Sequence, residues 1–343
     1  MGPNGSSDSL KPSPKRLLLL YLLPIPVLFL SLWVGPSRMF GWEEVIAHFF
    51  QVGTIQEDAG QQMLHTILWD IRLPRILLGF LIGGALSVSG CALQAMFRNP
   101  LVCPYILGLS SGAAFGAAVS IAIGSGLLQL FSFGFGILAV GASYLLARSR
   151  KTVSIVSLIL SGVVVSGLFT ALLTIVQYCV DPFKLQTIVH WTMGNLHTAG
   201  WGKLRSAAGP ILVGTGILLL YRFRLNVIAL GDEQCRSVGL HPEAEKFRML
   251  VPATLAASAS VAVAGVIGLV GLLVPHLVRM MIGPDNRRLV PASFCFGGMY
   301  LVLVDDLARS LASVEIPIGV FTNLIGGPFL IYLLRKERVG WQI

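Results

Sequence analysis

The sequence predicts an all-α integral membrane protein with ten transmembrane helices, and three observations support this fold class. Hydrophobic residues make up 55% of the 343 residues and charged residues only 12%, whereas about 25% of a typical soluble domain is charged. The apolar residues recur in blocks of roughly 17–25, the length with which a helix crosses about 30 Å of hydrocarbon. These blocks contain many of the 38 glycines, and small residues let membrane helices approach one another closely.

The chain begins with a polar stretch, residues 1–16, that is typical of a disordered cytoplasmic tail. The apolar run after it is long for the core of a signal peptide and lacks a small-residue cleavage site, so we expect it to remain as the first span. Residues 17–343 then form one ten-helix domain. The predicted spans are 17–34, 74–96, 104–123, 128–146, 153–176, 207–221, 250–264, 266–282, 290–307 and 318–334.

Polar residues and prolines mark the ends of the early spans. Arg72 and Arg75 stand at the outer mouth of the second span, where Pro74 is expected to start the helix. A polar turn over 98–101 reverses the chain at the other face. The third, fourth and fifth spans follow after short connections.

The later spans have less regular boundaries. Between the fifth and sixth spans, Trp191 and Trp201 lie in a segment, 177–206, that is typical of an interfacial helix with aromatic anchors. Gly265 and Gly268 separate the seventh span from the eighth. The ninth and tenth spans complete the domain.

The distribution of basic residues predicts the orientation. If the N-terminus is cytoplasmic, 18 of the 25 Lys and Arg residues fall in inner segments and 7 in outer segments. Inner loops of membrane proteins carry the excess of Lys and Arg. We therefore expect a multi-pass protein with both termini in the cytoplasm. Such a topology requires an even number of spans, and ten satisfies it.

The inner segment 225–248 has the character of a contact element. It carries seven charged residues, and Asp232 is expected to cap a short helix that Gly239 ends, before Pro242 opens the next one. Val238 and Leu240 give the element an apolar side. A short amphipathic helix on the cytoplasmic face suits insertion into a groove of another protein.

Several kinds of chemistry are excluded by what the sequence lacks. No GxxxxGK[ST] motif occurs, so this chain has no nucleotide site of the P-loop type. The five cysteines stand apart without a CxxC pair, and no cluster has metal-ligand spacing. No basic patch interleaved with aromatic residues points to nucleic acid. We expect no enzymatic activity, no bound metal and no cofactor of its own, so that energy for transport comes from a partner.

Five groups of motifs follow one another along the chain. They are Arg72-Leu73-Pro74-Arg75 with the small residues of 84–90; Gln94 with Arg98-Asn99-Pro100-Leu101 and 108–112; Leu230-Gly231-Asp232-Glu233 with Val238-Gly239-Leu240; 265–272 with Pro275, His276 and Arg279; and Ala308-Arg309 with 315–319 and 326–328. In this order and on these sides of the membrane, they resemble the permease subunits of ABC importers for iron-siderophore complexes, haem and cobalamin.

The resemblance implies the type II ABC importer permease architecture, a homodimer with its translocation path at the dimer interface. It implies two cytoplasmic ABC ATPase subunits that use ATP and Mg²⁺, and an extracytoplasmic binding protein that delivers the substrate. The membrane would be the cytoplasmic (inner) membrane of a bacterium or archaeon. The expected cargo is an iron chelate, either a siderophore complex or haem, and cobalamin is the alternative.

The resemblance also implies roles for individual residues. The docking of the binding protein would use Arg72, Arg75 and Arg309, although anchoring to lipid phosphates is the plainer interpretation of the first two. Coupling to the ATPase would use Leu230, Gly231, Asp232, Glu233, Val238, Gly239 and Leu240. The fifth and tenth spans would line the path with Ser161, Ser166, Thr170, Thr174, Thr322 and Asn323.

Two other functions deserve comparison with an ABC permease. Asp305 and Asp306 suggest an ion-coupled secondary carrier or an intramembrane protease, because acids in a span are costly and usually functional. However, they lie near the outer end of the span, and neighbouring helix residues point about 100° apart, so they cannot form a facing dyad. His190 and His197, seven residues apart, could share a helix face and contact haem iron, which is a weaker alternative.

Overall fold

The computed structural model describes residues 14–35, 43, 59–149, 152–311 and 314–336. Most of the predicted tail, residues 1–13, lies outside this part. The described elements are the helices α1 (Pro14–Leu22), α2 (Pro24–Ser31), α4 (Ala59–His65), the π-helix η2 (Thr66–Arg72), α5 (Leu73–Phe97), the 3₁₀-helix η3 (Pro104–Leu107), α6 (Leu109–Ile123), α7 (Leu128–Ala147), the strands β1 (Arg148–Ser149) and β2 (Thr152–Val153), and the helices α8 (Ile155–Cys179), α9 (Pro182–Thr192), α10 (Trp201–Leu220), α11 (Arg222–Leu230), α12 (Asp232–Ser237), α13 (Pro242–Ala264), α14 (Val270–Ile282), α15 (Asn286–Ser310) and α16 (Ile318–Lys336).

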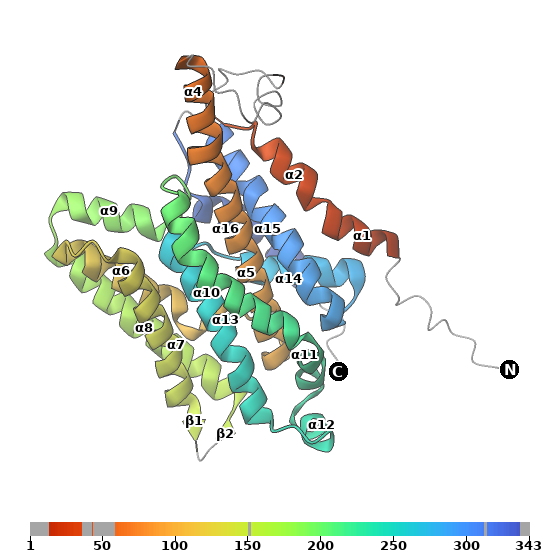
Figure 1. Ribbon diagram of the computed structural model, residues 1–343. Coiled ribbons are helices and arrows are strands. Elements are labelled where there is room, and N and C mark those ends of the chain that lie inside the picture. Colours follow the sequence, from red (N-terminus) through yellow and green to blue (C-terminus); the bar gives the residue numbers. More distant parts are fainter. Residues whose placement is uncertain (1–13, 36–42, 44–58, 150–151, 312–313, 337–343) are drawn as a thin grey trace.

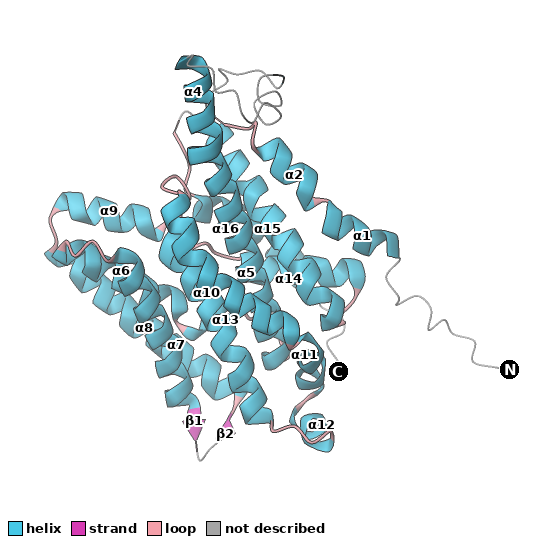
Figure 2. Cartoon of the chain, in the orientation of Figure 1, coloured by secondary structure: helices cyan, strands magenta, loops and turns pink. Residues whose placement is uncertain are grey.

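The predicted all-α membrane fold is confirmed. Figure 2 shows helices throughout the described chain, with a two-stranded hairpin at one end. Six described helices are long and apolar enough to cross a membrane: Gly60–Phe97, Leu128–Ala147, Ile155–Cys179, Trp201–Leu220, Pro242–Ala264 and Asn286–Ser310. Shorter apolar helices occupy the four other predicted positions, at Leu17–Ser31, Leu109–Ile123, Val270–Ile282 and Ile318–Tyr332. A helix of 15 residues is about 22 Å long, shorter than the hydrocarbon layer, so ten crossings remain a prediction.

The second predicted span begins much earlier than Pro74. One apolar helix runs over Gly60–Phe97, and its π-helical part lies directly before the proline. The N–H of Leu73 donates to the carbonyl of Leu68, five residues back. Because proline removes one backbone donor and crowds the preceding turn, a wider π-turn accommodates it within the helix. Pro74 stands in the first turn of α5, as predicted, but α5 continues the helix that precedes it, so Pro74 does not start the apolar helix as a whole.

Backbone breaks divide two of the predicted spans and shorten a third. The first is broken between α1 and α2, where Pro24 opens the second helix. The third consists of η3 and α6, which meet at Gly108 with φ +81°. The eighth begins at Val270 rather than 266, because Gly265 (φ +73°) and Leu269 (φ +63°) hold the connection in a left-handed backbone that ends the helix.

Helix α5 lies at the centre of the molecule and packs against α10, α13, α14 and α15. Close helix packing through glycine, as predicted, is found on two of its sides. A Cβ on Gly90 would lie 1.8 Å from the carbonyl oxygen of Gly271 in α14, and one on Gly83 would lie 2.2 Å from that of Gly297 in α15. Only glycine permits these approaches between helix backbones.

The two ends of the helix bundle carry different elements, as Figure 1 shows. The hairpin β1–β2 and the short helix α12 lie at the lower end of the view, where the charge distribution predicts the cytoplasm. Helices α4 and α9 lie toward the opposite end. Helix α8 runs along the outside, and only 17% of its most apolar 18 residues are buried, against 83% for the helix Gly60–Phe97. The structure therefore leaves α8 with an unpartnered apolar face.

Candidate functional site

Arg75 of α5 lies in a buried cluster with two acids from distant parts of the chain. Its Nε and Nη2 donate to Oδ2 and Oδ1 of Asp305, both at 2.8 Å, and its Nη1 and Nη2 donate to Oε1 and Oε2 of Glu315, both at 3.0 Å. A guanidinium has five donors in a planar fork, so it can pair with two carboxylates. The cluster fixes α5 to α15 and to the connection that follows α15.

A second cluster ties α2 to α15 and to η2, the π-helix that precedes α5. Arg309 pairs with Asp306 and donates through Nη2 to the carbonyl oxygen of Ser31 at 2.8 Å. The hydroxyl of Ser31 donates to Asp306 Oδ1 at 2.7 Å. Arg72 donates through Nη1 to the carbonyl oxygen of Leu32 at 2.7 Å. The carbonyls left open at the end of α2 thus find donors from η2 and α15.

The structure brings the three predicted docking arginines to one end of the molecule but turns them inward. Arg72 and Arg75 are each 7% exposed and Arg309 is 3% exposed. Docking of a binding protein through their charges would require exposed guanidinium groups, which this conformation does not present. Their role in docking stays a prediction. Asp305 and Asp306 pair with different arginines, so they do not form the dyad that a protease would need.

Glu315 belongs to the Arg75 cluster, and it was not among the site residues predicted from the sequence. Burial would raise the pKa of its carboxyl, but the hydrogen bonds and charge of Arg75 outweigh that effect and hold the pKa below its usual range. Its side chain is 38% exposed, so the cluster reaches the protein surface through this residue. A signal was present in the sequence, because a charged residue near a span calls for a partner of opposite sign.

The predicted coupling segment forms a compact turn between α11 and α13. Gly231 (φ +120°) separates α11 from α12, and Gly239 (φ +79°) ends α12 in the left-handed conformation. The N–H of Leu240 returns to the carbonyl of Cys235 at 2.9 Å, which completes a glycine-terminated helix end. Gly239 and Pro242 therefore act as predicted. Leu230 and Val238 are 67% and 61% exposed, so the element presents apolar side chains to its surroundings.

Asp232 holds the coupling segment in a different way from the one predicted. The N-cap of α12 is Gly231, and Asp232 stands in the first turn without a capping hydrogen bond. Its carboxylate instead accepts from Lys246 Nζ at 2.9 Å, and Glu243 accepts from the same ammonium at 3.1 Å. Glu233, which follows it, is exposed. The Asp232–Lys246 ion pair connects α12 to the start of α13, which continues into a predicted span, and Glu243 holds the same ammonium from within α13.

The six predicted path residues divide into two groups. Ser161 and Thr322 are buried, at 9% and 0% exposure, and their hydroxyls donate to backbone carbonyls. Their expected place on an open path is wrong for the single chain. Ser166 is partly buried, whereas Thr170, Thr174 and Asn323 are exposed. Only this second group can line a space beside α8 and α16.

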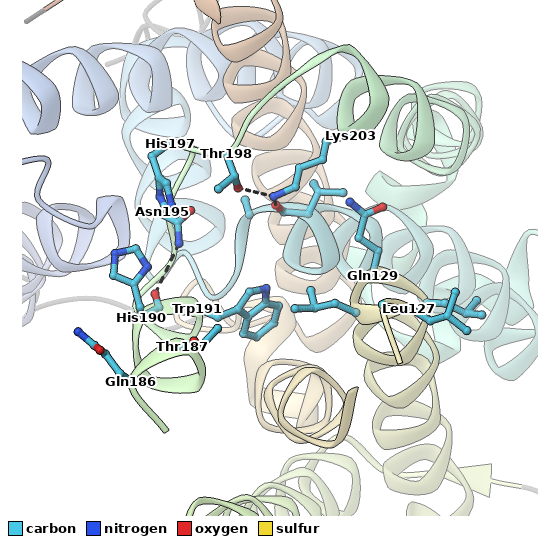
Figure 3. A pocket seen from close by; sticks show the side chains of 15 residues that line it. Leu127, Gln129, Gln186, Thr187, His190, Trp191, Asn195, His197, Thr198 and Lys203 are labelled. Carbon is cyan, nitrogen blue, oxygen red and sulfur yellow. Dashed lines mark hydrogen bonds between the residues drawn. The ribbon is translucent and has the colours of Figure 1, made fainter. Parts of the chain in front are cut away.

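A cavity of about 850 Å³ lies near α9. It is bordered by the α6–α7 connection, α9, the connection 193–200, the start of α10 and the end of α13. Figure 3 shows His190, Asn195 and His197 on one side, with Leu127, Gln129 and Lys203 across from them. Trp191 of α9 lies between the two groups.

His190 and His197 meet in this cavity, with ring centroids 5.0 Å apart and planes at 81°. The prediction that they share a helix face is wrong, because α9 ends at Thr192 and the connection after it folds back. Burial and the neighbouring His190 lower the pKa of His197. The described residues contain no group of three or more His, Cys, Asp or Glu that could hold a metal ion.

Comparison with known proteins gives relatives over nearly the whole chain. The FecCD transport family matches residues 20–336. The molybdate import permease MolB of Haemophilus influenzae is 37% identical over 332 residues, 95% of this chain and 97% of that protein. The cobalamin import permease BtuC of Halobacterium salinarum is 39% identical over 276 residues, 80% and 74% of the two chains. The hemin transport permease HmuU of Yersinia pestis is 35% identical over 325 residues, 89% and 97%.

A solved structure supports the same grouping. It is an ABC transporter assigned to the metal-chelate type, in an inward-facing conformation. It superposes with a TM-score of 0.81 at 37% sequence identity and covers 94% of this chain and 99% of that one. The arrangement of helices described above is therefore that of an ABC permease of this type.

Proposed function

The chain belongs to the FecCD transport family, and on this premise we propose that it imports an iron chelate, a siderophore complex or haem. It is a multi-pass membrane permease of an ABC importer and has no enzymatic activity of its own. The observation that carries the function is the match over residues 20–336, which includes the coupling segment and both clusters at the opposite end. The iron chelate is supported by relatives such as the hemin permease.

The partners of the proposed importer fit surfaces that the structure leaves open. A second copy of the chain would cover apolar side chains of α8 and α16, including Leu168 and Leu324, which are 60% and 67% exposed. Two ATPase subunits would receive Leu230 and Val238 of the coupling segment. An extracytoplasmic binding protein would dock at the end that carries Arg72, Arg75 and Arg309. We place both termini in the cytoplasm of a bacterial or archaeal inner membrane.

Cobalamin and molybdate are the competing cargoes, because relatives of similar identity carry them. The test is ATP-driven uptake into vesicles that contain the permease, its ATPase and its binding protein. We expect uptake of a ferric siderophore or of hemin that needs all three components and Mg-ATP. Uptake of cobalamin or molybdate alone would contradict the iron assignment, and uptake by the lone permease down an ion gradient would contradict the ABC function.

A further inference from the structure

The cavity beside α9 carries positive charge that its own walls do not neutralise. The charge is that of Lys203; the imidazoles of His190 and His197 also line the cavity, and none of the lining residues is Asp or Glu. Lys203 Nζ donates to the hydroxyl of Thr198 and to the carbonyl oxygen of Val263 at 3.4 Å. Among the described acids, none forms an ion pair with it. The ammonium therefore has neutral acceptors for two of its three donors and attracts an anion through the third.

The walls of the cavity differ in chemistry from one side to the other. Trp191, Leu127 and Val263 supply aromatic and aliphatic surface, whereas Gln186, Asn195 and His197 supply amide and imidazole groups. Sites for organic ligands are mainly apolar with a few polar groups that fix orientation, and they measure about 300–1,000 Å³. A cavity of about 850 Å³ is in that range, and a bare tetrahedral oxyanion would leave most of it to water.

We propose that this cavity binds a carboxylate-bearing iron chelate, with a carboxylate of the ligand on Lys203 Nζ and its apolar body against Trp191 and Leu127. His190 and His197 lie at the opposite wall, where imidazole nitrogens can hydrogen-bond to further oxygen atoms of the chelate. This inference rests on the proposed function, because it specifies the chemistry of the cargo. It places the binding site near α9, toward the end of the molecule opposite α12.

The test measures binding without transport. The permease in complex with its ATPase, in lipid nanodiscs without ATP, is titrated with hemin, with ferric citrate and with molybdate. Lys203→Met should weaken the binding of hemin and of ferric citrate by roughly tenfold or more, since a charge-assisted hydrogen bond contributes about 1.5–3 kcal/mol. Lys203→Arg keeps the charge and should restore most of the affinity.

A matched control is available on α9 itself. Lys184 also donates to a backbone carbonyl, that of Ala122 at 2.8 Å, but it does not line the cavity. Lys184→Met should leave both affinities unchanged. Each variant must elute as a single species that keeps its ATPase, which separates loss of the site from loss of the fold.

Several outcomes would overturn the proposal. Equal affinities of Lys203→Met and the unchanged protein would contradict the carboxylate site. An equal loss of affinity in Lys184→Met would contradict it as well. If molybdate bound with the same dependence on Lys203 and neither chelate bound, the cavity would be a site for a bare oxyanion. Binding of chelate without ATP-driven uptake would refute the proposed function while the site stands, and uptake without any effect of Lys203→Met would refute the site alone.

Discussion

At the scale of single residues, the structure is governed by the need to compensate charge inside an apolar bundle. Arg75 and Asp305 are both buried, and each would be costly without the other. Asp306 and Arg309, which form an ion pair within α15, compensate each other's charge in the same way. The same arginines that suggest an external partner in the sequence thus have internal partners in this conformation.

Removing one member of the Arg75–Asp305 pair should destabilise the protein more than removing both. Arg75→Met or Asp305→Asn leaves a buried charge unpaired and should cost about 3–5 kcal/mol of stability. In Arg75→Met with Asp305→Asn, the loss should be smaller than the sum of the two. The measurement is unfolding of the purified permease in detergent, evaluated as a double-mutant cycle. Strictly additive losses would show that the pair does not interact as the distances indicate.

Glu315 should make stability depend on acid pH. Arg75 holds the pKa of its carboxyl below the usual value, so the stabilisation is present above the ordinary pKa of about 4.3 and is lost as the pH falls through the folded-state pKa. Glu315→Gln lacks this contribution. The unfolding midpoints of the two proteins should therefore differ near neutral pH and converge in acid. A difference that stays constant across the titration would rule out this linkage.

At the scale of elements, glycines and prolines decide where helices end and how α12 is held. The coupling segment has a glycine on each side of α12, and both have a positive φ. The segment also continues directly into α13. A displacement of α12 would therefore reach the membrane helix α13 through the Asp232–Lys246 ion pair.

Substitutions at Gly239 should separate backbone conformation from side-chain loss. Gly239→Val forces a β-branched residue into a left-handed backbone. This conformation costs an ordinary L-residue roughly 1–2 kcal/mol, and a β-branched residue more. We expect reduced ATPase stimulation and transport with normal expression. Gly239→Asn is the matched control, because asparagine tolerates this conformation. Full coupling in the valine variant, or equal loss in both variants, would place the coupling element elsewhere.

At the scale of the whole molecule, the buried centre and the exposed flank have different tasks. Helix α5 is enclosed by its neighbours, whereas α8 presents apolar and hydroxyl side chains outward. Thr170 and Thr174 satisfy their hydroxyls with carbonyls one turn back, at 2.7 and 2.9 Å. A surface of this kind can face lipid, a second copy or a path without leaving polar groups unpaired.

Cysteine labelling should show which hydroxyl residues line the path. In a background with the exposed Cys179 changed to Ser, Thr174→Cys should react with a water-soluble thiol reagent on the order of tenfold faster than Ser161→Cys, because burial lowers both access and thiolate fraction. The assay follows labelling in membrane vesicles that hold the assembled importer. Similar slow rates at both positions would mean that α8 faces lipid and not a water-filled path.

The sequence by itself determined the fold class, the positions of the apolar helices and the glycine-ended coupling segment, because these depend on composition, hydropathy and local backbone chemistry. Gly239 and Pro242 could be placed from neighbouring residues alone. The pairing of Arg75 with Asp305 and Glu315, the return of His197 to His190 and the burial of Ser161 and Thr322 could not. These features join residues that are far apart in the chain or on different elements, and only the packing of the helices decides which side chains meet and which face water.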